Sequence, residues 1–488
     1  MALYTRLLLL LAPMLSLAGC GSQSSSSSED ETLYASEQVE PSVGDYVFTR
    51  INEDPKSLHP VNVNNATSLQ IKNLMFQSLL SISPTSLKPV PSLAVDQPEI
   101  SEDGMEMRYE IREEATWDNG EPITAADVRF TLKAILMPYT DAGHLRPYLD
   151  FVERIEVDPD HPKKFTVIAE RPYFRAIYSF GLQNILPRYH YDPEGALKDY
   201  SLVELKNMPH GATPPPELKT FADKFNSAAF MRNPAKIVGS GPYRLESWRR
   251  NQSITLARKS DYWADDLQQQ ALAAYPKKLI FKVIDDINTA VAELKKGNID
   301  ILVHIPPRIF KEELQQNQSL KKHYDLVTTN SFNYGFLALN NLPPRGRMPY
   351  FTDRDVRWAF AHLLDVEQVI KQLRYGYAER IIGPISPENE DAYNDTLSPP
   401  KHSLEKARRF LDKAGWKDRD GDGIREKIMG GRRVEFRPEI ITFNPIKERT
   451  ALLLKKECER VGIELKITNL KATALLERLK ERDYDLTL

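Results

Sequence analysis

From residue 41 onward, short runs of strand-forming hydrophobic residues alternate with amphipathic segments that carry helix-capping residues. The run 46–48 predicts a first strand, and residues 463–467 alternate between hydrophobic and charged, as in a half-buried strand. Helices are predicted to begin at Pro445 and after five capping residues, which are Thr124, Asn288, Thr352, Asp365 and Ser403. This alternation is typical of an α/β fold.

The first twenty residues predict export. An apolar run at 7–18 is shorter than the roughly 20 residues that span a bilayer, and it has the length of a secretory hydrophobic region. It ends in Leu-Ala-Gly-Cys, which resembles a bacterial lipobox and implies cleavage before Cys20 and lipid attachment to its sulfur. An uncleaved anchor, or an ordinary signal peptide with a chance cysteine, is the alternative.

Residues 1–19 are therefore expected to be a lipoprotein signal peptide, and residues 20–40, rich in serine and acidic residues, a solvated tether. The mature protein is then expected in the periplasm or at the cell surface, held to the membrane by its lipid.

Composition narrows the classes of partner. The 488 residues are 41% hydrophobic and 27% charged, which is ordinary for a globular protein. The 65 basic and 68 acidic residues nearly balance, which argues against nucleic-acid binding. Two cysteines, Cys20 and Cys458, exclude a disulfide scaffold and an all-cysteine zinc site. Cys458 shares a helical face with Leu454 and Val461, which favours a buried, inert thiol.

The sequence contains no common catalytic motif. Signatures of zinc proteases, serine hydrolases, phosphate-binding loops and dinucleotide-binding loops are all missing, and the nine histidines are scattered. Asp285 and Asp286 precede a predicted helix, where they would stabilise the positive end of its dipole. We expect no enzymatic activity, no cofactor and no resident metal, although residues far apart in sequence could still converge.

One acidic segment allows two interpretations. Asp418, Asp420, Asp422 and Gly423 match the first, third, fifth and sixth positions of a calcium-binding loop. The glutamate expected at the twelfth position is replaced by Met429. An acidic glycine turn between a helix and a strand is the simpler interpretation, and weak calcium binding is the alternative.

Four sequence blocks point to a known family. They are residues 93–128 with Thr-Trp-Asp-Asn-Gly-Glu-Pro, 238–263 with Val-Gly-Ser-Gly-Pro-Tyr, 283–302 ending in Lys-Gly-Asn-Ile-Asp, and 336–378. Together and in this order they resemble the family 5 extracellular solute-binding proteins, the peptide- and nickel-binding receptors of bacterial importers. The resemblance runs from about Asp45 to the last residue.

The resemblance implies a two-lobed, type 2 periplasmic-binding-protein-like fold, here a monomer that closes over a ligand and docks on an ABC transporter permease. It places the first lobe at residues 41–64 and 184–330, an extra subdomain at 65–183, and the second lobe at 331–488. Family members continue where this chain stops, within a predicted buried strand. We therefore expect the second lobe to be incomplete and the sequence to be a fragment or a truncation.

The same resemblance suggests ligand-binding residues in two places. The first follows Leu-His-Pro at 58–60, and the second is a crossing segment expected to be a hinge strand; the residues are Asn62, Asn64, Asn65, Ala66, Asn333, Tyr334 and Phe336. Asparagine amides can donate to and accept from a peptide backbone, but a plain polar loop explains them equally well. His59 stands where the family usually has an acidic residue, so a role for it is in doubt. The glycines around Ser240 are interpreted as a tight turn.

The leading hypothesis is a lipid-anchored receptor that captures oligopeptides for an ABC importer. A receptor of the same fold for a nickel chelate, haem, an opine or an oligosaccharide is the second. An enzyme or a purely structural surface lipoprotein is the third.

Overall fold

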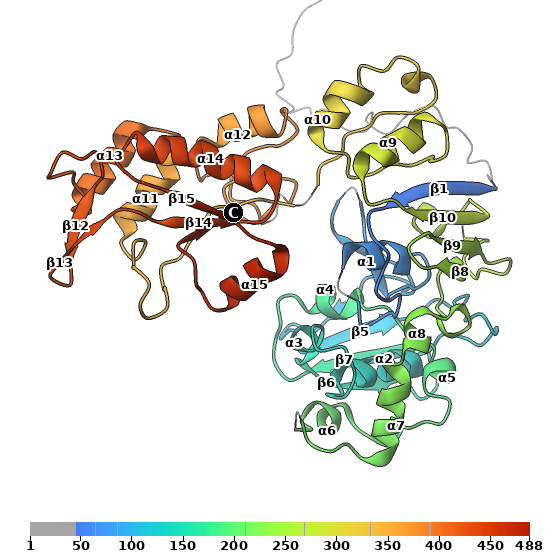
Figure 1. The fold of residues 1–488 in the computed structure, drawn as a ribbon. Helices are drawn as coiled ribbons and strands as arrows, with labels where there is room; N and C mark the ends of the chain where they lie inside the picture. The colour runs from blue at the N-terminus through green and yellow to red at the C-terminus, as the bar shows by residue number, and fades with distance from the viewer. Residues whose placement is uncertain are drawn as a thin grey trace, which may run out of the picture.

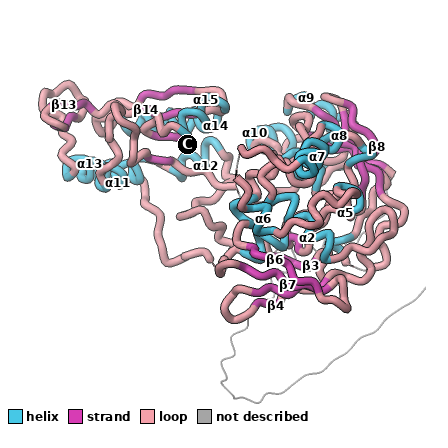
Figure 2. Tube along the Cα trace, turned by 90° about the horizontal axis from the view of Figure 1, so that it is seen from below, coloured by secondary structure: helices cyan, strands magenta, loops and turns pink. Residues whose placement is uncertain are grey.

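The computed structural model describes residues 45–488, except residues 64, 85, 210, 268, 332, 390 and 391. Figure 1 shows two bodies, with helices α11 to α15 in the one that holds the C-terminus, and Figure 2 shows the same separation from below. The predictions for residues 1–40, including the lipidation of Cys20, lie outside the described residues. Within the described part, no helix is both long enough and apolar enough to cross a membrane.

The first sheet joins the start of the chain to strands about 200 residues later. Its order is β1-β10-β9-β8, with β1 parallel to β10 and the other neighbours antiparallel. The strands are β1 (Tyr46–Ile51), β8 (Tyr243–Arg249), β9 (Ser253–Arg258) and β10 (Lys278–Val283). The strand predicted at 46–48 is thus confirmed as the first part of β1.

A second sheet, of order β4-β5-β7-β6, is antiparallel throughout and belongs to the predicted extra subdomain. The strands of this region are β2 (Leu80–Ile82), β3 (Pro89–Pro91), β4 (Glu99–Ile100), β5 (Glu106–Glu110), β6 (Val152–Val157) and β7 (Lys164–Ala169). Its helices are α1 (Ala66–Lys72), α2 (Ala125–Leu136), α3 (Arg146–Leu149) and α4 (Ala176–Gly181).

One continuous hydrophobic core joins this region to the first sheet, since a single cluster of buried side chains extends from Ile51 to Phe281. Phe130 of α2, for example, meets Phe221 of α7 edge to face at 6.2 Å. The helices between the two sheets are α5 (Arg188–Tyr191), α6 (Leu202–Lys206), α7 (Pro216–Phe225) and α8 (Ala228–Arg232). Shared packing of this kind makes the two regions stabilise one another.

A small helical unit follows the first sheet. It contains α9 (Ile287–Lys295), α10 (Pro307–Ile309), a π-helical turn (Phe310–Leu314) and a 3₁₀ turn (Leu320–Lys322), packed around their own buried cluster. Asp286 caps α9 by accepting hydrogen bonds from the backbone and hydroxyl of Thr289, at 2.8 and 2.9 Å. The prediction that Asn288 is the cap is therefore wrong, while Asp286 does lie at the positive end of the helix dipole.

The second lobe has a mixed sheet of order β11-β16-β14-β15. Its strands are β11 (Ala338–Leu339), β14 (Glu439–Thr442), β15 (Lys466–Asn469) and β16 (Leu486–Thr487), and β12 (Glu426–Met429) pairs with β13 (Arg432–Glu435) in a separate hairpin. The helices are α11 (Arg354–Leu363), α12 (Val366–Leu373), α13 (Leu404–Lys413), α14 (Pro445–Glu459) and α15 (Ala472–Lys480). The last strand lies between two neighbours and is buried, as the sequence predicted.

Most helix starts agree with their capping signals. Thr124 and Asp127 form a capping box on α2, and Asp365 and Ser403 cap α12 and α13 by accepting backbone hydrogen bonds. Helix α11 is capped by Asp353, one residue after the predicted Thr352. The strand predicted at 463–467 is shifted, since β15 occupies Lys466–Asn469. Cys458 is fully buried in α14, as the sequence predicted, and burial raises the pKa of its thiol, which disfavours the reactive thiolate.

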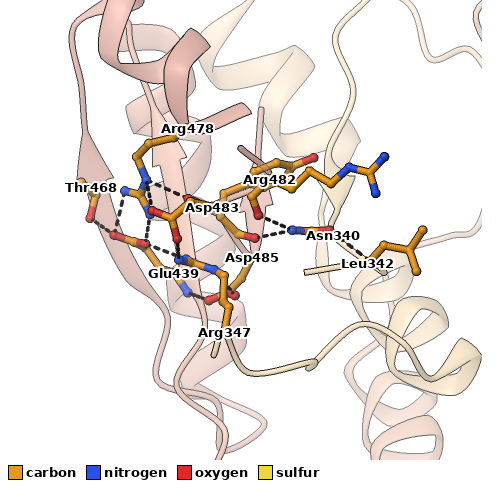
Figure 3. Close-up of polar contacts among 10 residues, drawn as sticks. Asn340, Leu342, Arg347, Glu439, Thr468, Arg478, Arg482, Asp483 and Asp485 are labelled. Atoms are coloured by element: carbon orange, nitrogen blue, oxygen red, sulfur yellow. Dashed lines mark hydrogen bonds and ion pairs between the residues drawn. The ribbon is translucent and has the colours of Figure 1, made fainter. Parts of the chain in front are cut away.

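An ion-pair network ties the two ends of the second-lobe sequence together (Figure 3). Arg347 donates to Asp483 at 2.5 Å, to Glu439 at 2.8 Å and to Asp485 at 2.9 Å. Arg478 donates to Glu439 from the other direction at 2.6 Å. A depression of about 540 Å³ lies beside this network. Because the charged groups of the network pair with one another, we interpret it as structural.

Candidate ligand-binding site

The chain between β1 and α1 is anchored in the core by Leu58 and His59, both fully buried. Leu58 donates its backbone N–H to Met231 at 2.9 Å. The His59 ring packs edge to face on Phe225 at 4.5 Å, and its Nδ1 accepts from the backbone of Val61 at 3.3 Å. Burial, reinforced by the charge of Lys72, lowers the pKa of His59 to about 3. His59 is therefore a neutral core residue.

The predicted ligand-binding residues at 62–66 differ in how the structure uses their side chains. Asn65 caps α1 by accepting from the backbone of Ser68 at 2.9 Å, which occupies its oxygen. The oxygen of Asn62 accepts from the Ser57 hydroxyl at 2.8 Å, while its buried Nδ2 donates to no group among the described residues. Ala66 is exposed at the first position of α1, and Asn64 lies outside the described residues. The side-chain N–H₂ of Asn62 is therefore an unused hydrogen-bond donor within the described residues.

Lys72, at the end of α1, was not identified from the sequence. Its Nζ donates to the carbonyl of Pro60 at 3.1 Å, and burial lowers its pKa to about 8. No carboxylate lies within ion-pair distance of it in the described part of the chain. Burial, together with the charge of Lys72, also lowers the pKa of His144. The turn at Pro60 is thus held by a buried amine from the far end of α1, and no sequence signal pointed to this lysine.

The second group lies on the segment that leaves the small helical unit and enters the second lobe. Tyr334 and Phe336 are 48% and 62% exposed, with ring centroids 5.8 Å apart, and Asn333 is exposed beside them. In the described residues between 325 and 336, no backbone group is hydrogen-bonded to another backbone group. The segment was expected to be a hinge strand. The prediction of a strand is wrong, because pairing begins only at Ala338 in β11, while the role as a hinge stays a prediction.

The two groups of predicted residues come from different bodies of the fold. In the described part, no hydrogen bond, ion pair or ring contact joins the segment 57–72 to the segment 333–336. A ligand that contacts both groups would have to bridge them.

The glycines around Ser240 serve packing. A Cβ on Gly239 would lie 2.4 Å from the carbonyl oxygen of Met75 and 2.5 Å from the Phe76 ring. Gly241 donates its N–H to the same carbonyl at 2.8 Å. The backbone of this loop therefore lies directly against the residues that follow α1. The chain does bend at residues 240–242, and because neither glycine has a positive φ, it is the close approach of two backbone segments that requires glycine here.

Comparison with known proteins identifies the family. The family model for "Bacterial extracellular solute-binding proteins, family 5 Middle" matches residues 88–488. The chain belongs to this family. Its fold is accordingly the two-lobed, type 2 periplasmic-binding-protein fold with mixed α/β lobes.

Two relatives illustrate the range of ligands within the family 5 fold. The oligopeptide-binding protein AppA of Bacillus subtilis is 26% identical, over 96% of this chain and 76% of AppA. The structure of AppA in complex with a nonapeptide matches with a TM-score of 0.65 at 23% identity, over 92% of this chain and 79% of that one. NikA of Brucella suis, solved in complex with Fe(III)-EDTA, matches with a TM-score of 0.68 at 20% identity, over 91% and 78% of the two chains. The fold therefore serves both peptides and metal chelates.

Proposed function

We propose that this family 5 protein captures oligopeptides between its lobes and delivers them to the permease of an ABC importer. The observation that carries the proposal is the segment 325–336, whose described residues leave their backbone groups free of other backbone groups and expose the rings of Tyr334 and Phe336. A peptide in extended conformation can pair with such a backbone, and pockets beside it can accept its side chains. The relationship to AppA supports the same ligand class.

A receptor for a metal chelate is the second candidate. Its support is the structural likeness to NikA with Fe(III)-EDTA and to NikZ of Campylobacter jejuni with Ni(L-His), the latter at 22% identity and a TM-score of 0.65. A compact chelate would contact far less of the segment 325–336 than a peptide does. Loss of the exposed aromatic side chains therefore separates the two candidates.

Tyr334→Ala and Phe336→Ala are expected to weaken peptide binding at least tenfold each, because truncating an aromatic hot spot that the ligand covers costs about 2 kcal/mol or more. Thermal unfolding with a random nonapeptide pool, and with Ni(L-His) in a parallel series, measures this. Ligand at about 100 times its dissociation constant stabilises the bound form by roughly 2.7 kcal/mol.

Phe174→Ala is the matched control, because Phe174 is 92% exposed in the predicted extra subdomain. Stabilisation by Ni(L-His) and none by the peptide pool would favour the chelate. Equal peptide affinities for the wild type and both variants would show that the segment 333–336 is not part of the binding site.

We also propose that Cys20 carries the lipid that holds the protein to the membrane. The short apolar run and the Leu-Ala-Gly-Cys sequence support this. Cys20→Ser is expected to move the protein from the membrane pellet to the soluble fraction after a carbonate wash, with an unchanged unfolding midpoint. Cys458→Ser is the control for loss of a thiol elsewhere in the chain. A Cys20→Ser protein that stays in the pellet would refute lipid anchoring at this residue.

A further inference from the structure

The loop between α13 and β12 gathers three carboxylates. Asp418, Asp420 and Glu426 each offer one oxygen, and these oxygens lie within 4.8 Å of one another. Two ligands on opposite sides of a calcium ion, each at about 2.4 Å, are about 4.8 Å apart. The spacing is therefore compatible with a shared cation of that size.

Glu426 distinguishes this loop from an ordinary acidic turn. It is 1% exposed, and its Oε1 accepts from the backbone of Arg419 at 2.9 Å, with the Arg419 guanidinium 3.8 Å away. Its Oε2 is buried and has no hydrogen-bond partner among the residues that the structure describes. A buried carboxylate oxygen without a partner is costly unless a cation or donor meets it. Glu426 occupies the ninth position of the calcium-loop pattern that begins at Asp418, whereas the sequence analysis looked for a glutamate only at the twelfth.

The backbone fixes Asp418 and Glu426 close together. Lys417 and Glu426 exchange two backbone hydrogen bonds, at 2.9 and 3.1 Å, which close the base of the loop. Gly421 and Gly423 have φ values of +79° and +88°, which turn the chain back on itself. The backbone of the loop therefore holds Asp418 and Glu426 near one another before any ion binds.

We propose that this loop binds a calcium ion through Asp418, Asp420 and Glu426. All three ligands are carboxylate oxygens, which suit hard cations, and no histidine or thiolate takes part, which disfavours zinc. Calcium accepts the irregular geometry of a loop, whereas magnesium demands a near-ideal octahedron. Arg433 forms an ion pair with Asp420, so a bound calcium ion has to compete with the Arg433 guanidinium for the Asp420 carboxylate. The site lies on the second-lobe hairpin, and its action is to tie that hairpin to α13.

The test uses the full-length protein after dialysis against EDTA. Calcium is expected to bind with a dissociation constant on the order of 10⁻⁴–10⁻³ M, as in other extracellular modules, and to raise the unfolding midpoint. Terbium luminescence excited through tryptophan reports on this loop, because Trp416 lies two residues before Asp418. Glu426→Gln and Asp418→Asn each keep the size of the side chain and are expected to weaken binding at least tenfold.

Glu435→Gln is the matched control, because Glu435 pairs with Glu426 across the β12–β13 hairpin but contributes no oxygen to the cluster. Asp418 is exposed, so Asp418→Asn decides the question if Glu426→Gln fails to fold. The proposal is overturned if about 10 mM calcium, ten times the upper end of the expected range, leaves the wild type unchanged. It is also overturned if magnesium binds equally well, or if Glu426→Gln and Asp418→Asn bind calcium as Glu435→Gln does.

Discussion

Gly239→Ala is expected to destabilise the first lobe by about 3 kcal/mol, at the upper end of the usual cost of overpacking a core. The added Cβ would lie 2.4 Å from the carbonyl oxygen of Met75 and 2.5 Å from a ring carbon of Phe76. Neither neighbour can move cheaply. The carbonyl is backbone that already accepts a hydrogen bond from Gly241, and Phe76 is 2% exposed within the main core.

Thermal unfolding should show this loss as a drop of roughly 6–12 °C in the midpoint of the first lobe, if a domain of that size shifts by about 2–4 °C per kcal/mol. Gly383→Ala is the control, because nothing lies within 4 Å of its Cβ position and its φ is not positive. Hydrogen exchange in the segment 72–76 should rise only in the Gly239 variant. A midpoint equal to that of Gly383→Ala would mean that the two backbone segments separate readily.

Several helix starts could be predicted from the sequence because a capping residue lies only a few residues from the backbone groups that it binds. The caps at Thr124, Asp365 and Ser403 lie within three residues of the groups they bind, so sequence spacing alone locates them. At α9 the sequence analysis chose Asn288 as the cap and gave Asp286, two residues earlier, only a role at the helix dipole. The structure favours Asp286, whose carboxylate meets both groups of Thr289.

Contacts between distant segments could not be predicted in this way. β1 pairs with β10, and Gly239 meets Met75, because the whole chain brings them together. The candidate site shows both kinds of contact. Asn65 looks like a ligand-binding amide in the sequence, yet its oxygen caps α1 through a local contact with Ser68, three residues later, which the capping rules could have indicated. The partner of Lys72 is a backbone carbonyl twelve residues earlier, which composition and periodicity do not reveal.

The family resemblance supplied the architecture that local signals could not. Its four blocks are strand, turn and helix segments whose order specifies the two-lobed fold, and the family match over residues 88–488 confirms it. The resemblance did not predict the contacts or the exposure of individual side chains. The segment at 333–336, expected as a strand by analogy, has no pairing partner among the described residues, and its exposure became visible only in three dimensions.

Arg347→Ala is expected to destabilise the second lobe by about 3–5 kcal/mol, because it removes one partner from a partly buried ion-pair network and leaves carboxylates uncompensated. Arg347 is the cation shared by Glu439, Asp483 and Asp485, and its side chain is 16% exposed. Asp485 is the most buried of the three carboxylates, at 7% exposure of its side chain. After the substitution, Glu439 would keep Arg478, but Asp485 would keep only the backbone N–H of Glu439 at 2.8 Å.

Arg437→Ala is the matched control, since Arg437 also pairs with two glutamates of this lobe but is 46% exposed. Exposed pairs contribute about 0–1 kcal/mol, so its midpoint should hardly change. A double-mutant cycle with Glu439→Gln isolates the coupling between Arg347 and Glu439, expected at roughly 0.5–3 kcal/mol. Additive effects of the two substitutions would show that the contact drawn in Figure 3 contributes nothing to stability.

The pH dependence gives the same network a second, independent readout. Burial alone would raise the pKa of Glu439, but hydrogen bonds from Arg478, Thr468 and Arg347 outweigh it and hold the pKa at about 2, below the usual 4.5. A depressed carboxyl pKa stabilises the fold above pH 4.5, and that contribution is lost as the pH falls toward 2. Asp485 works in the opposite direction, because burial raises its pKa. Arg347→Ala should therefore flatten the acid loss of stability between pH 4.5 and 2. An acid profile parallel to that of the wild type would show that Arg347 does not set the ionisation of Glu439.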